Sequence, residues 1–241
     1  MGSTVVVESR DPLLFWEDDF PVPSYAFRAE DVRTELFTPT TALPPAQPWF
    51  FLPHSEVKRW YDLEADGRVV EHAAWELADA AVAGRIVVSW QPGLLDRWTE
   101  EDAEVASHPQ DPHHRVDALP SSRHVVVSVG GAVLADSRHP VVLFETGLPT
   151  RFYLPTGDVD LSRLETSENA SHCPYKGIAD RYWSLPDVPN LAWGYTRPTP
   201  AVDGIAGRIC FYNELVDLTV DGVELPRAVS PFSETKHRPG S

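Results

Sequence analysis

Residues 136–145 read Asp-Ser-Arg-His-Pro-Val-Val-Leu-Phe-Glu, and residues 8–17 read Glu-Ser-Arg-Asp-Pro-Leu-Leu-Phe-Trp-Glu. Each segment combines a Ser-Arg pair, a proline, a run of large apolar residues and a final glutamate. A short apolar run bounded by a proline is typical of a buried β-strand. The chain therefore contains two versions of one predicted strand, and both versions end on a carboxylate.

The similarity between the two halves continues in the same order beyond this strand. The corresponding residues are Pro21 and Pro149, Tyr25 and Tyr153, Asp31-Val32 and Asp158-Val159, Trp60 to Leu63 and Tyr182 to Leu185, Ala74-Trp75 and Ala192-Trp193, and Ala83 to Ile86 and Ala206 to Ile209. Many anchors in a fixed order indicate a tandem duplication of a domain of roughly 100 residues.

The anchors also predict where the domains begin and end. We assign residues 1–105 to a degenerate first copy and residues 123–228 to a second copy that keeps the motifs. Residues 106–122 are rich in proline and polar residues and lack apolar periodicity, which is typical of a linker. Residues 229–241 have the composition of a flexible tail.

Strand and turn signals are clearest in the second copy. We expect hairpins over Val125–Val129 and Ala132–Ala135 and over Val216–Val220 and Val223–Leu225, strands over Val141–Glu145 and Arg151–Leu154, and a short helix over Asp158–Leu164. The glycine-containing turns of these hairpins tolerate positive φ. The 23 prolines and 14 glycines disfavour long helices. The predicted fold class is mostly β, with antiparallel sheets and few short helices.

Charge and composition restrict the partners of the protein. A formal net charge of -16 argues against nucleic acid and against anionic membrane surfaces, because both are bound by clustered Lys and Arg. No apolar run approaches the ~18 residues of a transmembrane helix, and no charged-then-apolar leader is visible. With two cysteines, we expect a cytoplasmic protein with reduced thiols. The oligomeric state is open.

The segment Ser171-His172-Cys173-Pro174-Tyr175-Lys176-Gly177 contains a thiol, an imidazole, a phenol and an amine. Its proline and glycine predict a turn. Functional groups are commonly presented on loops that a rigid scaffold holds in place. We therefore expect this turn to carry the chemistry of the protein.

Together with other motifs of the second copy, this turn resembles the bacterial and fungal family called domain of unknown function 427. The resemblance is carried by Glu145 to Pro149 with Tyr153, His172 to Gly177, Tyr182 to Ser184, Ala192-Trp193, and Ile205 to Arg208 followed by Phe211 to Asn213. It covers about Val125 to Leu225, and the first copy resembles a degenerate member.

The resemblance implies a β-tent-like fold for each of the two tandem copies, in which two antiparallel sheets lean together over a cavity. The family has also carried a nucleotidyltransferase label. The sequence has no Gly-Ser pair followed by an Asp-x-Asp metal site and no Gly-rich phosphate loop, so it gives that label no support. The resemblance therefore implies a fold and a candidate pocket without a settled reaction.

Lys176 is the sharpest functional signal in the turn. A lysine in a dry pocket can act as a base or an amine nucleophile, whereas one paired with a carboxylate stays charged and binds an anionic group. The alternative is an ordinary exposed loop lysine. The first copy has no lysine in register, because Phe50 to His54 occupy this region. Chemistry that uses Lys176 is therefore expected in the second copy alone.

Glu145 is the predicted catalytic partner of Lys176. The alternative is a structural carboxylate that accepts backbone N–H groups of the adjacent Gly-Pro turn or pairs with Arg151. The corresponding Glu17 of the degenerate copy is compatible with this alternative.

Six further residues are candidate ligand-binding groups: Tyr175, Tyr212, Cys173, Asn213, Tyr153 and Arg151. The aromatic ones could equally be core residues at strand ends. Cys173 follows His172, but adjacent residues of an extended segment point to opposite faces, which favours a small buried thiol over a nucleophile. Trp183 and Trp193 have counterparts in the first copy and are expected to be structural.

No metal or cofactor is expected. The two cysteines lack a Cys-x-x-Cys spacing, and the histidines of the linker, His108, His113 and His114, are more simply explained as solvated residues. The predicted function is binding of a small polar or anionic organic molecule, with possible acid–base catalysis by lysine, glutamate and tyrosine and without metal or nucleotide. The alternatives are a non-catalytic ligand sensor or protein-interaction module, and a natural-product tailoring enzyme.

Overall fold

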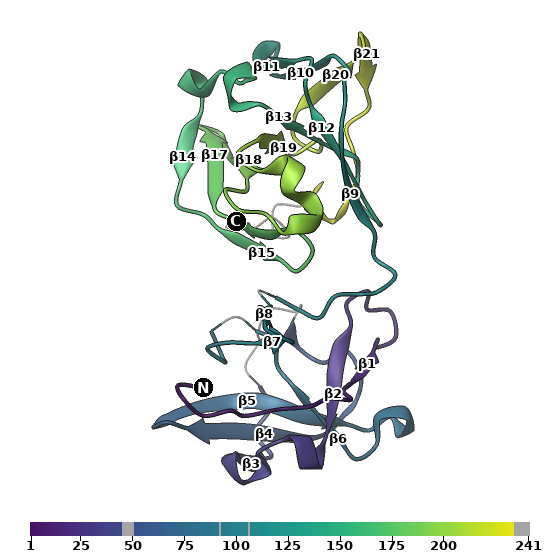
Figure 1. Ribbon diagram of the computed structural model, residues 1–241, viewed down its shortest axis with the longest axis vertical. Coiled ribbons are helices and arrows are strands. Elements are labelled where there is room, and N and C mark those ends of the chain that lie inside the picture. Colours follow the sequence, from purple (N-terminus) through teal and green to yellow (C-terminus); the bar gives the residue numbers. More distant parts are fainter. Residues whose placement is uncertain (45–50, 92, 106, 234–241) are drawn as a thin grey trace. The chain divides into compact units, whose positions relative to one another are not determined.

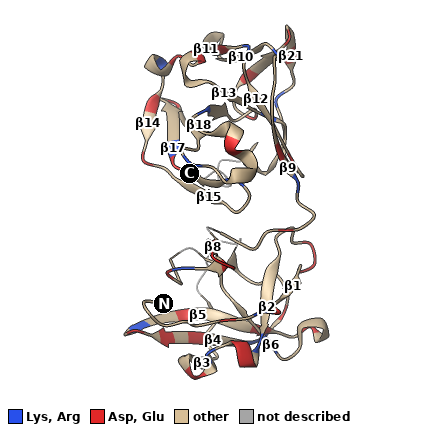
Figure 2. Cartoon of the chain, viewed as in Figure 1, with Lys and Arg blue, Asp and Glu red and all other residues tan. Residues whose placement is uncertain are grey.

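The computed structural model describes residues 1–44, 51–91, 93–105 and 107–233. The chain divides into two compact units, Met1–Asp111 and Pro112–Ser241 (Figure 1). Both consist mainly of antiparallel strands with short 3-10 helices, so the predicted mostly-β class is confirmed. Acidic residues occur in both units (Figure 2). Within the described ranges, no helix is long and apolar enough to cross a membrane.

The first unit is built on a six-stranded sheet with the order β1-β2-β6-β5-β4-β3. Its strands are β1 (Leu13–Phe15), β2 (Ser24–Arg28), β3 (Phe37–Thr40), β4 (Val57–Ala65), β5 (Arg68–Leu77) and β6 (Arg85–Val88), and β7 (Thr99–Glu100) pairs separately with β8 (Ala103–Glu104). Consecutive residues of β6 pack into different buried clusters, Val87 with Trp75 and Val88 with Leu63. Because neighbouring residues of a strand point to opposite sides, the sheet is covered on both faces.

The second unit contains a seven-stranded sheet, a four-stranded sheet and a separate hairpin. The large sheet has the order β14-β17-β18-β19-β13-β12-β9 and the small one β11-β10-β20-β21. The strands are β9 (Val116–Pro120), β10 (Val125–Val129), β11 (Ala132–Ser137), β12 (Val141–Glu145), β13 (Arg151–Leu154), β14 (Glu165–Ser167), β15 (Ser171–Cys173), β16 (Gly177–Ala179), β17 (Arg181–Leu185), β18 (Val188–Gly194), β19 (Ile209–Phe211), β20 (Asp217–Val220) and β21 (Val223–Leu225).

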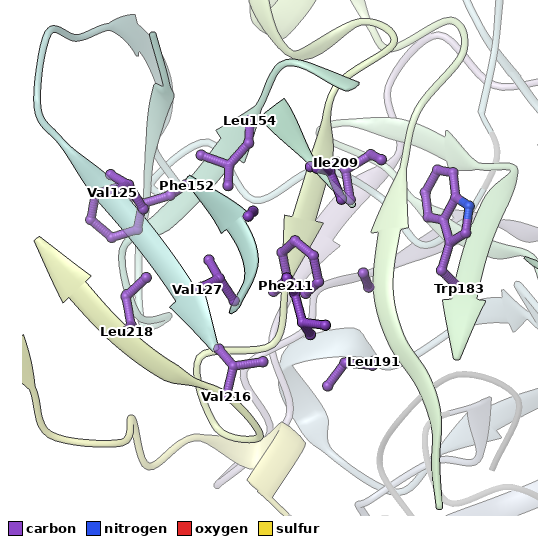
Figure 3. Close-up of a cluster of buried hydrophobic side chains, with 14 of the residues drawn as sticks. Val125, Val127, Phe152, Leu154, Trp183, Leu191, Ile209, Phe211, Val216 and Leu218 are labelled. Atoms are coloured by element: carbon purple, nitrogen blue, oxygen red, sulfur yellow. The ribbon is translucent and has the colours of Figure 1, made fainter. Parts of the chain in front are cut away.

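The seven-stranded sheet separates two buried clusters. One lies between the two sheets, where Val127 and Leu218 of the small sheet face Phe152 and Phe211 of the large one (Figure 3). The other contains Leu143 and packs beneath the 3-10 helix η7 (Pro200–Ile205). Alternating residues of β12 therefore contribute to different cores, with Val142 in the first and Val141 and Leu143 in the second.

The two large sheets share a strand order. Read from β12, the second sheet runs β12-β13-β19-β18-β17-β14, and the first runs β1-β2-β6-β5-β4-β3. If the six strands of each series are numbered by their order along the chain, both sheets have the spatial order 1-2-6-5-4-3. The second sheet has β9 as an additional edge strand beyond β12.

Both predicted hairpins form, but three other expectations differ from the structure. The helix predicted over Asp158–Leu164 is replaced by two single 3-10 turns, η5 (Thr156–Asp158) and η6 (Leu161–Arg163), because Val159 between them is extended and buried. The predicted linker 106–122 includes β9, which pairs with β12. Residue 106 of that linker lies outside the described residues.

The tail predicted to be flexible over 229–241 is held to the second unit at its start. The Ser230 hydroxyl donates to the buried carboxylate of Glu214, and Phe232 packs against Tyr212. These contacts satisfy a buried charge and cover an aromatic ring, which the polar composition of the segment does not reveal. Residues 234–241 lie outside the described part of the chain.

Candidate functional site

The predicted turn lies at the tip of a two-stranded hairpin. β15 pairs with β16, and residues 174–176 connect them. The turn is fixed to the loop that precedes η7, because Thr199 donates its backbone N–H to the carbonyl of Lys176 at 3.0 Å and its hydroxyl to the carbonyl of Tyr175 at 2.7 Å. Gly177 adopts a φ of 94°, which a residue with a Cβ rarely adopts. The backbone thereby directs the Lys176 side chain into the domain.

The ammonium group of Lys176 contacts both carboxylate oxygens of Glu145. The side chains are only 9% and 5% exposed, respectively, so this is a buried ion pair rather than a surface one. The alternative of an exposed loop lysine does not hold. Because β12 ends at Glu145, the strand places the carboxylate beside the turn.

His114 also contacts this carboxylate and was not predicted to belong to the site. Its Nε2 lies 3.3 Å from Oε1 of Glu145, and its ring stacks on Tyr175 with 4.1 Å between centroids. The expectation that His114 is solvated in a linker is wrong, since its side chain is 20% exposed.

Pairing between β9 and β12 brings His114 to the site. The backbone N–H of Thr146 donates to the carbonyl of Arg115 at 3.0 Å, and the N–H of Arg115 donates to the Thr146 hydroxyl at 2.9 Å. These bonds extend the ladder past the end of β12, where Val116 pairs with Glu145, and bring His114, two residues before Val116, within reach of the carboxylate. The only sequence signal was the group of histidines in the segment that was predicted to be a linker.

Two buried tyrosines lie near this group. Burial raises the pKa of Tyr195 and of Tyr153 well above the usual range, and the negative charge of Glu145 adds to the effect in both. Both phenols therefore remain protonated near neutral pH. They could donate a hydrogen bond there, but they could not accept a proton as phenolates.

Arg151, a predicted ligand-binding residue, forms an internal ion pair with Glu214. Its two terminal nitrogens donate to the two carboxylate oxygens at 2.7 and 2.8 Å, and its guanidinium lies over the rings of Trp193 and Tyr212. Burial alone would raise the pKa of Glu214, but the hydrogen bonds and charge of Arg151 outweigh burial and lower it. The suggested pairing of Arg151 with Glu145 is therefore wrong, and its charge is already compensated.

The other predicted ligand-binding residues occupy different environments. Tyr153 is fully buried and its hydroxyl accepts a hydrogen bond from the Trp193 indole at 3.2 Å, and Tyr212 is only 4% exposed. Neither offers a surface to a ligand in this conformation. Cys173 is half-buried on the hairpin strand next to the turn. Trp193 is buried, as expected for a structural residue.

Asn213 is separated from the turn by the large sheet. Its side-chain amide donates to the carbonyl of Thr150 at 2.7 Å. It lines an open groove of about 510 Å³ whose other walls include Val142 and Phe144. These residues alternate along β12 with Leu143 and Glu145, so the groove lies on the opposite face from Lys176. The candidate residues thus divide between two places.

We call Lys176, Glu145, His114 and Tyr175 the Lys176 cluster. It combines an ammonium, a carboxylate and an imidazole in contact, with an aromatic ring beside them. Within the described residues, no group of three or more His, Cys, Asp or Glu side chains is arranged to hold a metal ion. An ammonium, a carboxylate and an imidazole in contact can take part in charge pairing, hydrogen bonding and proton transfer.

Residues 117–222 match a family model described as Domain of unknown function (DUF427). The matched range contains Glu145, Tyr175 and Lys176 and begins just after His114. The resemblance inferred from the motifs is confirmed for this part of the chain. A comparison with curated proteins found no match.

Proposed function

We propose that this protein binds a small polar or anionic organic molecule at the Lys176 cluster. The cluster lies in the second unit, which belongs to the DUF427 family. The observation that carries the proposal is a buried ammonium–carboxylate pair on a turn, beside the partly exposed His114 and Tyr175. Lysine is rarely buried unless its charge is paired, because removing an ion from water is costly.

An ammonium group has three N–H donors. The Lys176 ammonium contacts two oxygens of Glu145, and we assign its remaining donor to an oxygen atom of the ligand. Tyr175 would contact the ligand body, because the residue is half-buried and its ring is stacked on His114. This arrangement favours a ligand small enough to enter between the turn and the end of β12.

The same groups support acid–base chemistry as the enzymatic form of the proposal. A carboxylate in contact with both a lysine and a histidine can pass a proton between them, and it orients the imidazole ring. Proton transfer of this kind requires no metal and no nucleotide. Tyr153 and Tyr195 stay protonated near neutral pH, so they would take no proton in this step.

The binding proposal can be tested with the full chain by thermal shift. We would screen a panel of small carboxylates, phosphates and neutral polar compounds against the natural protein, Lys176→Met and Lys58→Met. Lys58 is an exposed lysine of the first unit and serves as the control. A ligand of the cluster should raise the melting temperature of the natural protein and of Lys58→Met, each relative to its own ligand-free value.

Lys176→Met should lose that increase. Equal stabilisation of Lys176→Met and the natural protein by every active compound would contradict the proposal, as would a panel without any active compound. Mass spectrometry of the bound compound after incubation then separates the alternatives. Conversion of the compound supports an enzyme, and binding without conversion supports a ligand sensor.

We further propose that the first unit is a diverged copy of the second. The shared strand order supports this, and so do matching local bonds. Ser9 donates to Asp31 at 2.7 Å, as Ser137 donates to Asp158 at 2.6 Å.

A matching bulge in the two sheets supports the same relationship. His72 and Asn190 both have positive φ, at 54° and 51°. In each case the backbone N–H donates to a side chain of the neighbouring strand, Asp62 in the first unit and Ser184 in the second. Such a strained position is an unusual feature to find twice at corresponding places.

The first unit uses its glutamate differently. Glu17 is buried and accepts hydrogen bonds from the backbone N–H groups of His54 and Ser55. Phe50, which was aligned with the turn, lies outside the described residues. A carboxylate held by backbone donors has a structural role, which supports the confinement of the chemistry to the second unit. We also propose a cytoplasmic location, in keeping with the free thiols of Cys173 and Cys210.

A further inference from the structure

The open groove on the other face of β12 has the size of a ligand site. Its volume of about 510 Å³ lies within the range of roughly 300–1,000 Å³ that is common for small-molecule pockets. It is lined by Leu119, Pro120, Ser121, Arg123, Val142, Phe144, Thr150, Phe152, Asn213, Leu225 and Pro226.

The walls of the groove are unusually apolar for exposed surface. Leu119, Phe144 and Leu225 are 52%, 47% and 36% exposed, and they come from three different strands, β9, β12 and β21. The floor is formed by Val142 and Phe152, which belong to the core between the two sheets. A hydrocarbon ligand bound in this groove would remove apolar surface of the protein and of the ligand itself from water.

The charge of the groove is opposite to that of the chain. Among the lining residues, Arg123 is the only ionisable one, and none is a carboxylate. The full chain carries a formal net charge of -16. Arg123 is 61% exposed and its nearest acidic oxygen, on Asp221, lies 4.0 Å away, so this ion pair is weak. The guanidinium can therefore bind an additional anion at the rim.

We propose that this groove binds a small organic amphiphile, with a hydrocarbon body against Leu119, Phe144 and Leu225 and one anionic group at Arg123. Asn213, whose side-chain amide is held in place by the Thr150 carbonyl, would hydrogen-bond a polar atom of the ligand. The site is independent of the Lys176 cluster, because the two use opposite faces of β12. It goes beyond the function proposed above and does not depend on it.

Two fluorescent probes test both halves of the proposal on the full chain. Anilinonaphthalene sulfonate carries an aromatic body and a sulfonate, and N-phenyl-1-naphthylamine has the same ring system without the charge. Both should bind the natural protein saturably. Arg123→Gln should weaken binding of the sulfonate about three- to five-fold, the size expected for a partly exposed ion pair, and leave the uncharged probe unchanged.

Phe144→Ser should weaken binding of both probes. The matched controls are Val133→Ser, which removes an exposed apolar side chain outside the groove, and Arg163→Gln, which removes an exposed charge elsewhere. Both controls should bind as the natural protein does. Circular dichroism and the melting temperature would show that each variant is folded, as expected for exposed positions.

Three results would overturn the proposal. The first is unchanged binding of both probes in Phe144→Ser, and the second is an equal loss of the two probes in Arg123→Gln. The third is self-association: if sedimentation shows that the natural protein is a dimer and Phe144→Ser is a monomer, the groove is covered by a second copy of the chain rather than by an amphiphile.

Discussion

Glu17 and Glu145, which the proposed duplication makes counterparts, are neutralised by different means. Glu145 meets the ammonium of Lys176, whereas Glu17 meets backbone N–H groups of His54 and Ser55. Backbone donors stabilise a carboxylate without adding a titratable group. The lysine adds a second charge that must be desolvated as well, which a purely structural role does not require.

The buried pair of the Lys176 cluster makes a prediction for stability. Lys176→Ala should lower the free energy of unfolding by about 3–5 kcal/mol, because it leaves the carboxylate of Glu145 buried without its partner. The double variant Lys176→Met/Glu145→Gln removes both charges and should recover most of that loss. Urea denaturation of the three proteins measures the difference, and a double variant no more stable than the single one would contradict this account.

The pair formed by Arg151 and Glu214 predicts a response to acid. The pKa of Glu214 is lowered in the folded state, so the stability it contributes is present above its ordinary pKa of about 4.5 and is lost as the pH falls through the lower folded value. The free energy of unfolding should therefore fall less steeply below about pH 4.5 in Arg151→Met/Glu214→Leu than in the natural protein. Identical slopes would show that Glu214 contributes nothing to acid unfolding.

The two thiols should differ in reactivity. Burial raises the pKa of Cys210 to about 12, with the charge of Arg151 opposing the shift in part, whereas Cys173 is only half-buried. Because the thiolate is the reactive form, iodoacetamide at pH 8 should modify Cys173 in the folded chain and Cys210 only after unfolding. Peptide mass spectrometry reads both sites, and labelling of Cys210 at the rate of Cys173 in the folded chain would contradict this prediction.

At the scale of single residues, the sequence predicted those site residues that lie within recognisable motifs. Lys176 and Glu145 could be proposed as partners because both lie in recognisable motifs of the second unit. His114 could not, because its position depends on which strand pairs beyond β12. Arg151 was assigned to a ligand because a single arginine in a strand does not reveal its partner, and Glu214 is distant in the sequence.

At the scale of the elements, β18 approaches its neighbour closely at Gly194. A Cβ added there would lie 2.6 Å from the carbonyl oxygen of Arg208. This is a steric clash with a backbone atom, which cannot move away as the end of a flexible side chain could. Gly194→Ala should therefore cost about 1–3 kcal/mol. Gly157→Ala is the matched control, because nothing lies within 4 Å of its added Cβ. It should be neutral or slightly stabilising, and thermal unfolding of both variants provides the comparison.

Elements with a strong local pattern were predictable, and elements that depend on partners were not. The hairpins of β10 with β11 and of β20 with β21 have apolar runs on both sides of a glycine turn. The short strand β9 ends on Pro120 in a proline-rich segment, and it pairs along its whole length with β12. A helix was expected over Asp158–Leu164 because the local sequence does not reveal that Val159, between η5 and η6, is extended and buried.

At the scale of the whole molecule, each unit has buried clusters of its own. Independent cores predict independent unfolding. Leu63→Ala, at a fully buried position of the first unit, should lower the free energy of unfolding by about 2–5 kcal/mol. In calorimetry it should lower the temperature of one unfolding transition, whereas Gly194→Ala should lower the temperature of the other. A single transition that both variants shift equally would show that the units unfold together.

The alternation of β12 ties the two proposed sites to one another. Val142 and Phe144 belong to the groove, and Leu143 and Glu145 belong to the opposite face. Deleting a single residue from this strand would turn every following side chain to the opposite face of the sheet. The carboxylate of Glu145 would then point into the groove, and Phe144 would point toward the ammonium of Lys176. A deletion or insertion within β12 would therefore disturb both sites at once, whereas a substitution can change one of them alone.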